Sequence, residues 1–273
     1  MDLVKAHALG NDFLLVEETQ VESVRDVGAL ARALCSRHRG IGADGLIVFA
    51  QRSGTATMRL LNADGSPSEI SGNGLRCLAA WLARDAALHT TIAVETDAGV
   101  KTLDLLDVAA NRYTFRAAMG EPRDVTKESI QVGAEVVEAV TLRVGNPQCV
   151  VLGEVTEERL HRLASALAIH PRFREGTNVE LATVEAPDRV RILIWERGVG
   201  PTEASGTGAC AAAVAAIAYG GAARDVHVES PGGTQRVEWR DDGLYLTGWA
   251  ELVGEVRALV DVARAQNMFG GPK

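Results

Sequence analysis

Cysteine is scarce in this chain of 273 residues, and its spacing argues against two kinds of site. The four cysteines, Cys35, Cys77, Cys149 and Cys210, form no C-x-x-C pair and have no histidine cluster beside them. Structural zinc sites and disulfide frameworks both need such grouping of cysteines. We therefore expect no disulfide and no bound metal. Each cysteine is expected to be a small buried apolar residue.

Positive charge is also in deficit. Lysine and arginine number 28 against 36 acidic residues, which gives a net charge of −8. Nucleic acids and anionic membranes attract proteins with a basic face, so neither partner is expected. The sequence also lacks an apolar run of membrane-spanning length and the charged-then-apolar layout of a signal peptide at its start. The prediction is a cytoplasmic protein.

What the chain does contain is one pattern, present twice. Ser71-Gly72-Asn73-Gly74 precedes an apolar segment that includes residues 78–82, and Ser205-Gly206-Thr207-Gly208 precedes the apolar residues 209–218. A helix without a polar face is typically buried. The first N–H groups of a helix lack carbonyl partners and attract anions. We therefore predict two buried helices, over about 73–84 and 209–218, whose first turns hold an anionic group.

Strand patterns surround both predicted helices. Alternating apolar residues and turn signals predict short strands through both halves, and helical spacing predicts two further helices. The strands are expected at about 3–17 (as a hairpin), 46–50, 57–62, 91–96, 100–108, 112–118, 138–144, 148–152, 177–184, 190–196, 225–230, 235–240 and 244–250, and the further helices at 24–37 and 156–168. The Gly-Glu-Pro-Arg-Asp segment at 120–124 is the expected linker.

These patterns predict an α/β (α+β) protein of two pseudo-symmetric domains, residues 1–119 and 120–257. In each domain a sheet is expected to wrap as a barrel-like layer around a central apolar helix. The tail, about 258–273, is expected to pack back on the first domain.

Motifs along nearly the whole chain resemble those of the diaminopimelate epimerase family. Besides the two glycine-rich helix starts, they are KAHALGNDF at 5–13, RHRGIGADG at 37–45, RLLNADGS at 59–66, GNP at 145–147, TNVE at 177–180, WERGVG at 195–200, SPGG at 230–233 and LTG at 246–248. The resemblance implies a cofactor-independent racemase or epimerase that converts LL- to meso-diaminopimelate in lysine biosynthesis. It also implies a homodimer, an amino acid as the small-molecule substrate, and two cysteines that exchange a proton on opposite faces of the α-carbon.

Both positions of those family cysteines are serine here, Ser71 and Ser205. Gln148 stands where the family usually has a histidine thought to assist one thiol, whereas Glu196, the partner of the other cysteine, is kept. A helix start can bring a thiol of pKa about 8.5 within reach of neutral pH. An alcohol is several pKa units less acidic and so a poorer general base. We therefore expect impaired two-base catalysis.

The binding residues look better preserved. Backbone N–H groups of Gly72, Asn73, Gly206 and Thr207 can hold the reacting carboxylate and stabilise charge that builds on proton removal. Arg197 can bind a second carboxylate through two hydrogen bonds, with a surface ion pair to Glu196 as the alternative. The resemblance implies that Asn11, Asn62, Asn146 and Asn178 contact the substrate. For each of these four, turn capping is the alternative.

Three functions stay open at this stage. One is the epimerase itself. Another is a diverged isomerase that uses Glu196, or another carboxylate such as Glu69, on a different substrate, as phenazine-pathway relatives of this fold do. The third is a catalytically silent amino-acid-binding protein or a Cys-to-Ser mutant made to trap substrate. Gln148 favours natural divergence, because trapping does not need that change.

Overall fold

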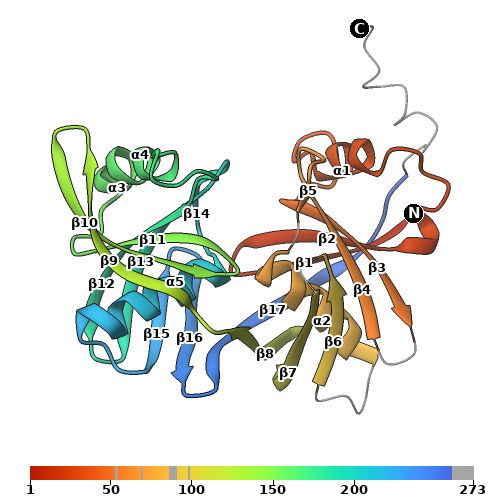
Figure 1. Ribbon diagram of the computed structural model, residues 1–273. Helices are drawn as coiled ribbons and strands as arrows, with labels where there is room; N and C mark the ends of the chain where they lie inside the picture. The colour runs from red at the N-terminus through yellow and green to blue at the C-terminus, as the bar shows by residue number, and fades with distance from the viewer. Residues whose placement is uncertain (53–54, 69, 86–90, 98, 260–273) are drawn as a thin grey trace, which may run out of the picture. The chain divides into compact units, whose positions relative to one another are not determined.

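The computed structural model describes residues 1–52, 55–68, 70–85, 91–97 and 99–259 (Figure 1). The strands are β1 Asp2–Ala8, β2 Asn11–Glu17, β3 Gly45–Arg52, β4 Thr55–Asn62, β5 Pro67–Ser68, β6 Thr91–Thr96, β7 Gly99–Ala109, β8 Arg112–Gly120, β9 Arg123–Val132, β10 Glu135–Val144, β11 Asn146–Leu152, β12 Asn178–Ala186, β13 Arg189–Glu196, β14 Gly200–Thr202, β15 Asp225–Ser230, β16 Gly233–Arg240 and β17 Gly243–Arg257. The helices are α1 Val27–Cys35, α2 Gly72–Asp85, α3 Glu157–Arg159, α4 Ser165–Ala168 and α5 Gly206–Ala215. Among the described residues, no helix combines the length and the hydrophobicity of a membrane span.

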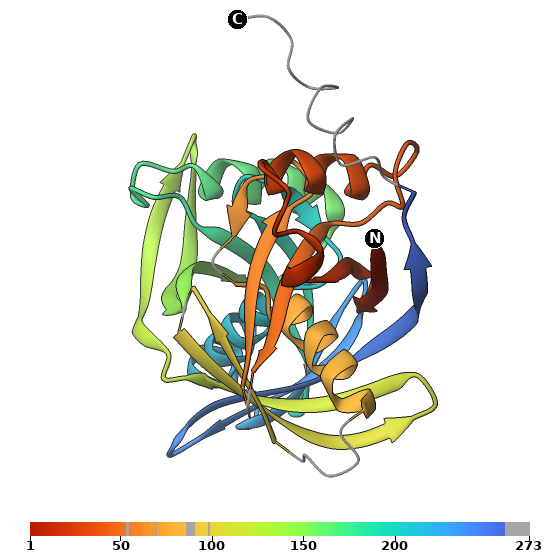
Figure 2. The ribbon, with the colours of Figure 1, turned by 90° about the vertical axis from the view of Figure 1, so that its right-hand side faces the viewer.

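The first of two compact units comprises Met1–Phe115 and the chain from Trp249 on. Its strands close into an eight-stranded barrel in the order β17, β1, β2, β3, β4, β6, β7, β8 and back to β17. Helix α2 runs inside this ring, where it contacts β1, β2, β6 and β7 (Figure 2). Helix α1 packs outside on β3 and β4.

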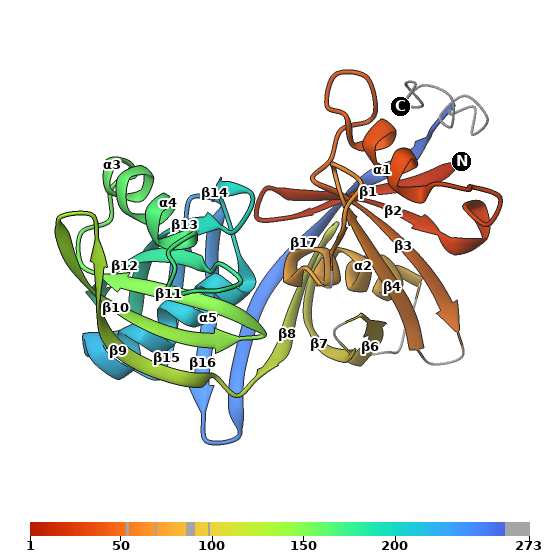
Figure 3. The ribbon, with the colours of Figure 1, turned by 45° about the horizontal axis from the view of Figure 1, so that its top comes forward.

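The second unit comprises Arg116–Gly248. Its strands pair in the order β9, β10, β11, β12, β13, β15, β16, β17. Helix α5 contacts β10, β11, β12, β13, β15 and β16, so the sheet wraps around it (Figure 3). Nine of the ten residues of α5 are buried, and most of these are alanine or glycine, whose small side chains let the surrounding strands approach closely. The predicted fold class is confirmed.

The two units repeat one order of pairing. In the first unit β1–β2 is antiparallel, β2–β3 parallel and β3–β4 antiparallel. The second unit repeats this order in β10–β11, β11–β12 and β12–β13. In both, the central helix follows a short strand, β5 or β14. Each position in one unit therefore has a counterpart in the other.

Strand register defines these counterparts. Phe13 pairs with Gly45, and Gly45 with Asn62. In the second unit Gln148 pairs with Asn178, and the register of Val179 with Trp195 places Asn178 opposite Glu196. Gln148, Asn178 and Glu196 thus correspond to Phe13, Gly45 and Asn62. Two residues further along β12 and β3, Glu180 corresponds to Ile47.

Some predicted boundaries differ from the structure. The two central helices were expected over 73–84 and 209–218, and α2 and α5 lie there, with α5 continued by a π-helical turn to Gly220. The helix expected over 156–168 is α3 and α4 joined by a π-helical turn. Within the expected linker, 120–124, only Glu121 and Pro122 interrupt the strands, and β9 begins at Arg123.

The chain crosses from one unit to the other within strands, not within loops. The chain leaves the first unit after Phe115, within β8, and returns to it at Trp249, within β17, where the sequence placed the boundaries after residues 119 and 257. A strand that continues from one unit into the next shows no break in its residue pattern. Of the predicted C-terminal tail, Ala258 is buried and its N–H donates to the carbonyl of Met1, whereas residues 260–273 lie outside the described residues.

Candidate active site

Ser71 begins the central helix of the first unit. Its Oγ accepts a hydrogen bond from the N–H of Gly74 at 3.1 Å, and its carbonyl accepts from Leu75 at 2.8 Å. This is N-cap geometry, in which the side chain satisfies one of the unpaired N–H groups of a first turn. The first two N–H groups, of Gly72 and Asn73, point along the helix axis, where an anion binds best. The cap uses only a lone pair of Oγ, so the hydroxyl proton stays available for transfer.

A chain of hydrogen bonds leads from this helix start to the loop before β3. Asn73, which is 3% exposed, donates to Asn11 at 3.2 Å and accepts from Arg76. Asn11 in turn donates to Asp44 at 2.8 Å. Two of the predicted binding residues of this unit, Asn11 and Asn73, are therefore brought together and held by charged groups.

Asp12 is the anchor of that loop, and the sequence analysis did not single it out. Arg37 donates to both of its carboxylate oxygens, at 2.8 and 3.1 Å, and Lys5 also binds it. Burial opposes ionisation of the carboxyl, but the hydrogen bonds and charges of Arg37 and Lys5 outweigh it and lower the pKa of Asp12 to about 2. The acidic and basic residues of the 5–13 and 37–45 motifs were the available signal.

Ser205 begins the central helix of the second unit in the same way. Its Oγ accepts from the N–H of Gly208 at 3.2 Å, and its carbonyl accepts from Ala209 at 3.0 Å. The Thr207 hydroxyl lies 3.5 Å from Oγ. Ser205 is 7% exposed. The N–H groups of Gly206 and Thr207 are those that the cap leaves for a ligand.

Three predicted residues form a polar row across the strands that face this helix. Gln148, Asn178 and Glu196 lie on one face of β11, β12 and β13 by register. Gln148 is 1% exposed, its Nε2 donates to the side chain of Asn146 at 2.6 Å, and its Oε1 has no hydrogen-bond partner. The structure therefore joins Asn146 to this row, which in the first unit holds Phe13, Gly45 and Asn62 instead.

Arg197 and Asn62 engage their own loops. The Asn178 side-chain oxygen accepts from the backbone N–H of Arg197 at 2.9 Å, and the Arg197 guanidinium donates to the carbonyl of Glu175 at 2.5 Å. Asn62 donates to the Ser66 hydroxyl at 3.0 Å and is exposed. This hydrogen bond is the kind that the turn-capping alternative predicts for Asn62.

Glu180 is the residue that the sequence analysis missed. It was quoted within the 177–180 motif but given no role. Its side chain is 0% exposed, and neither carboxylate oxygen has a hydrogen-bond partner among the residues that the structure describes. Burial first, and then the charge of Glu196, raise its pKa well above the ordinary value. Glu180 lies within the run of buried residues at the start of β12, so periodicity could not distinguish its position from the neighbouring apolar ones.

The cysteines do not replace the two serines. None of the four forms a disulfide, and all are buried, as predicted. Cys77 lies inside α2, where burial raises its pKa to about 12, so its thiol stays protonated at neutral pH. Glu69, the other acid considered from the sequence, lies outside the described residues.

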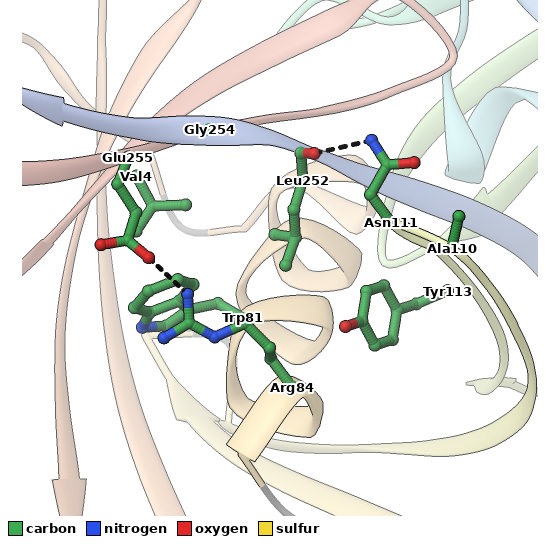
Figure 4. Close-up of a pocket in the computed structure, with 9 residues that line it drawn as sticks. All are labelled: Val4, Trp81, Arg84, Ala110, Asn111, Tyr113, Leu252, Gly254 and Glu255. Atoms are coloured by element: carbon green, nitrogen blue, oxygen red, sulfur yellow. Dashed lines mark hydrogen bonds and ion pairs between the residues drawn. The ribbon is translucent and has the colours of Figure 1, made fainter.

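A cavity of about 340 Å³ lies in the first unit, far along α2 from Ser71 (Figure 4). Trp81 and Arg84 from the end of α2 line it, with Asn111, Tyr113 and Leu252. Arg84 stacks on Trp81 at 3.7 Å and forms an ion pair with Glu255 at 2.6 Å. Its charge is thus already neutralised, and none of the predicted site residues lines this cavity.

Comparison with known proteins agrees with the motifs. The family model for diaminopimelate epimerase matches residues 3–125 and 140–253. A diaminopimelate epimerase from Desulforudis audaxviator is 40% identical over 271 residues, covering 93% of this chain and 97% of that protein. One from Heliobacterium modesticaldum is 38% identical over 269 residues, covering 91% and 96%.

Solved structures share the fold at lower identity. A hydroxyproline epimerase from Agrobacterium vitis superimposes with a TM-score of 0.69 at 16% identity, covering 94% of this chain and 91% of that chain. A phenazine biosynthesis protein from Bacillus anthracis gives 0.69 at 13%, covering 95% and 99%. These likenesses concern the fold alone. The family match over both units, and sequence relatives along nearly the full length, show that the chain belongs to the diaminopimelate epimerase family, a family of isomerases.

Proposed function

We propose that this protein inverts the α-carbon of an amino acid, with LL- and meso-diaminopimelate as the substrate pair, by proton transfer without a cofactor. The observation that carries the proposal is the repeated helix start: in each unit a serine caps the central helix, and the first turn of a helix is where a carboxylate binds best. The N–H groups of that turn also stabilise the negative charge that forms when the α-proton leaves. The names of the sequence relatives support the substrate.

The serines make the reaction slow in this proposal. Proton abstraction by Ser71 or Ser205 needs an alkoxide, whose formation at neutral pH costs about 1.4 kcal/mol for each unit by which the pKa exceeds the pH. A cysteine in the same place ionises far more readily. In the first unit the counterparts of Gln148 and Glu196 are Phe13 and Asn62. The row of residues equivalent to the polar row therefore holds no acid or base in that unit.

A second candidate rests on the two carboxyl groups, Glu180 and Glu196, that lie on the sheet face towards Ser205. They favour a diverged isomerase with carboxylate-based proton transfer on another amino acid. A third candidate is a silent binder or a Cys-to-Ser trap, which needs only the anion-holding helix starts.

Hydrogen exchange at the α-carbon tests the first proposal. We expect meso-diaminopimelate to incorporate deuterium from D₂O in the presence of the protein, at a rate well below that of the S71C/S205C double variant. Absence of exchange by the unaltered protein rules out the proposed function, and exchange by the double variant alone favours the silent binder or trap. Exchange by the unaltered protein as fast as by the double variant shows that the serines do not limit it.

Binding separates the remaining candidates. A ligand that binds the folded state raises the melting temperature. We expect meso-diaminopimelate to do so and histidine, proline and lysine not to. A shift with one of these three instead favours the diverged isomerase, while a shift with meso-diaminopimelate but no exchange favours the silent binder or trap.

We also propose a homodimer, as the family resemblance implies, and a location in the cytoplasm, as the sequence pattern predicts. Light scattering on the purified protein tests the dimer, which a mass of one chain would contradict.

A further inference from the structure

Glu180 is a buried acid on β12 that lies beside the start of α5, and the proposed function gives it no role. A Cβ added to Gly208 would stand 2.7 Å from Glu180 Oε1 and 3.3 Å from Ser205 Oγ. The two oxygen atoms therefore approach the same point beside the helix backbone. The absence of a side chain at Gly208 is what lets the carboxyl group come so close to the first turn.

The surroundings of Glu180 offer it little compensation for burial. Neither oxygen accepts a hydrogen bond from the described part of the chain, although both are buried. The titratable groups near it are Glu196 on β13, a carboxyl like itself, and Cys149 on β11, whose pKa burial raises. No cation of the described part of the chain is paired with it, and burial of an unpaired carboxyl favours the protonated form.

The first unit shows that the fold does not require an acid here. The counterpart of Glu180 is Ile47, and the counterpart of Gly208 is Gly74. A Cβ on Gly74 would stand 3.1 Å from Ile47 Cδ1. An apolar side chain thus fills the equivalent space beneath an equivalent helix start, at no cost in desolvation. The second unit carries a carboxylic acid instead, which folding alone does not explain.

We propose that Glu180 is a positioning residue for proton transfer at Ser205. It holds a proton that passes to Ser205 Oγ when the Ser205 hydroxyl gives its own proton to the substrate. This inference rests on the proposed function, in which Ser205 exchanges a proton with the substrate. It gives the second unit a proton reservoir that the Ile47 side of the molecule lacks.

The transfer balances in both directions. When the substrate carbanion is protonated, the Ser205 O–H bond breaks and a C–H bond forms, and the Glu180 proton passes to Ser205 Oγ. One proton has then moved from Glu180 to the α-carbon, and the negative charge from carbon to the Glu180 carboxylate. In reverse, the Glu180 carboxylate takes the Ser205 proton as Oγ takes the α-proton. A catalytic hydrogen bond can be long without substrate and tighten on binding.

The stored proton is measured without any activity. In protein labelled with ¹³C at the glutamate carboxyls, we expect one carboxyl resonance that still has the protonated position at neutral pH, and we expect E180Q to lack it. If all glutamate carboxyls of the unaltered protein are ionised at neutral pH, the reservoir does not exist and the proposal is overturned.

The relay is measured by α-hydrogen exchange of meso-diaminopimelate in D₂O, as a function of pH. E180Q keeps the shape of the side chain but cannot give up a proton, and we expect a loss of about tenfold or more in rate. We expect E180L, which copies the filling of the first unit, to lose as much. The matched control I47L should exchange at the unaltered rate. Melting temperatures show whether each variant is folded.

The two measurements keep the outcomes distinct. A folded E180Q that matches the unaltered protein in rate and pH profile overturns the relay, whatever the NMR result. A pH profile of the unaltered protein that falls where the Glu180 resonance titrates, with that fall absent in E180Q, supports it. If the unaltered protein exchanges no α-hydrogen, the proposed function fails and the relay with it, while the NMR measurement still decides whether Glu180 holds the proton.

Discussion

Gly208 and Glu180 are mutually dependent: the carboxyl oxygen of Glu180 occupies space 2.7 Å from where any side chain at position 208 would begin. Ser205 Cβ lies 3.2 Å from the same point. Both neighbours are buried, one on β12 and one at the cap of α5. The start of this helix is thus tightly packed on the side of the sheet.

G208A is expected to lower the free energy of unfolding by about 1–3 kcal/mol, because the added methyl group must displace buried atoms. Urea denaturation measures it. The control is G72A, at the other helix start, where an added Cβ meets nothing within 4 Å. It should be neutral or slightly stabilising, since alanine favours helix. Equal losses in the two variants would contradict this account of the packing.

E180Q is expected to change how stability depends on pH. The pKa of Glu180 is raised by folding, so its contribution is fully present below the unfolded value near 4.5 and is lost as pH rises towards the folded value. The stability of the unaltered protein relative to E180Q should therefore fall above about pH 4.5, by up to 1.4 kcal/mol per pH unit. Urea unfolding at several pH values measures this. A difference that does not vary with pH would show that Glu180 is ionised in the folded protein.

D12N is expected to show the opposite dependence. Folding lowers the pKa of Asp12 from 3.8 to about 2, so its stabilisation is present above the unfolded value and is lost as pH falls from about 4 to 2. We expect D12N to lose about 1–2 kcal/mol at neutral pH, a loss that shrinks across that acid range. Acid unfolding followed by circular dichroism tests it. D107N, at an exposed carboxylate, should leave the curve in place.

S71A and S205A are each expected to cost about 1 kcal/mol of stability, because each removes the side-chain oxygen that caps a central helix. The matched control is S165A. Ser165 donates within a helix to the carbonyl of His161 and caps nothing, so its loss should be near zero. Caps that cost no more than this control would mean that water replaces them fully.

E255Q should have a small effect. Its ion pair with Arg84 at 2.6 Å is exposed on both sides, and such pairs contribute about 0.2–1 kcal/mol. Arg84 keeps its stacking on Trp81 when the partner is neutral. Denaturation in low and high salt measures the difference, which should disappear in high salt. A loss of several kcal/mol would show that the pair is shielded from solvent.

Local patterns predicted the central helices well, because glycine starts and apolar composition act within a few residues. They failed at β9, where exposed and charged residues alternate with few buried ones and the paired strand β10 determines the conformation. They also failed at the two π-helical turns, whose extra residue per turn leaves no mark in composition. For Asn62 the turn-capping alternative and the site interpretation used the same residues, and only the bond to Ser66 indicates what the side chain contacts.

The sequence by itself determined the family, the two helix starts and the presence of a serine at each of them, because these are properties of residue type and order. Only the tertiary structure decided that Glu180 lies beside Ser205 while Ile47 fills the same place in the other unit. That difference depends on strand register, which brings together residues about 25 positions apart along the chain, and on the lack of a side chain at Gly208. Burial then sets the protonation of the acid, and burial is a property of the fold.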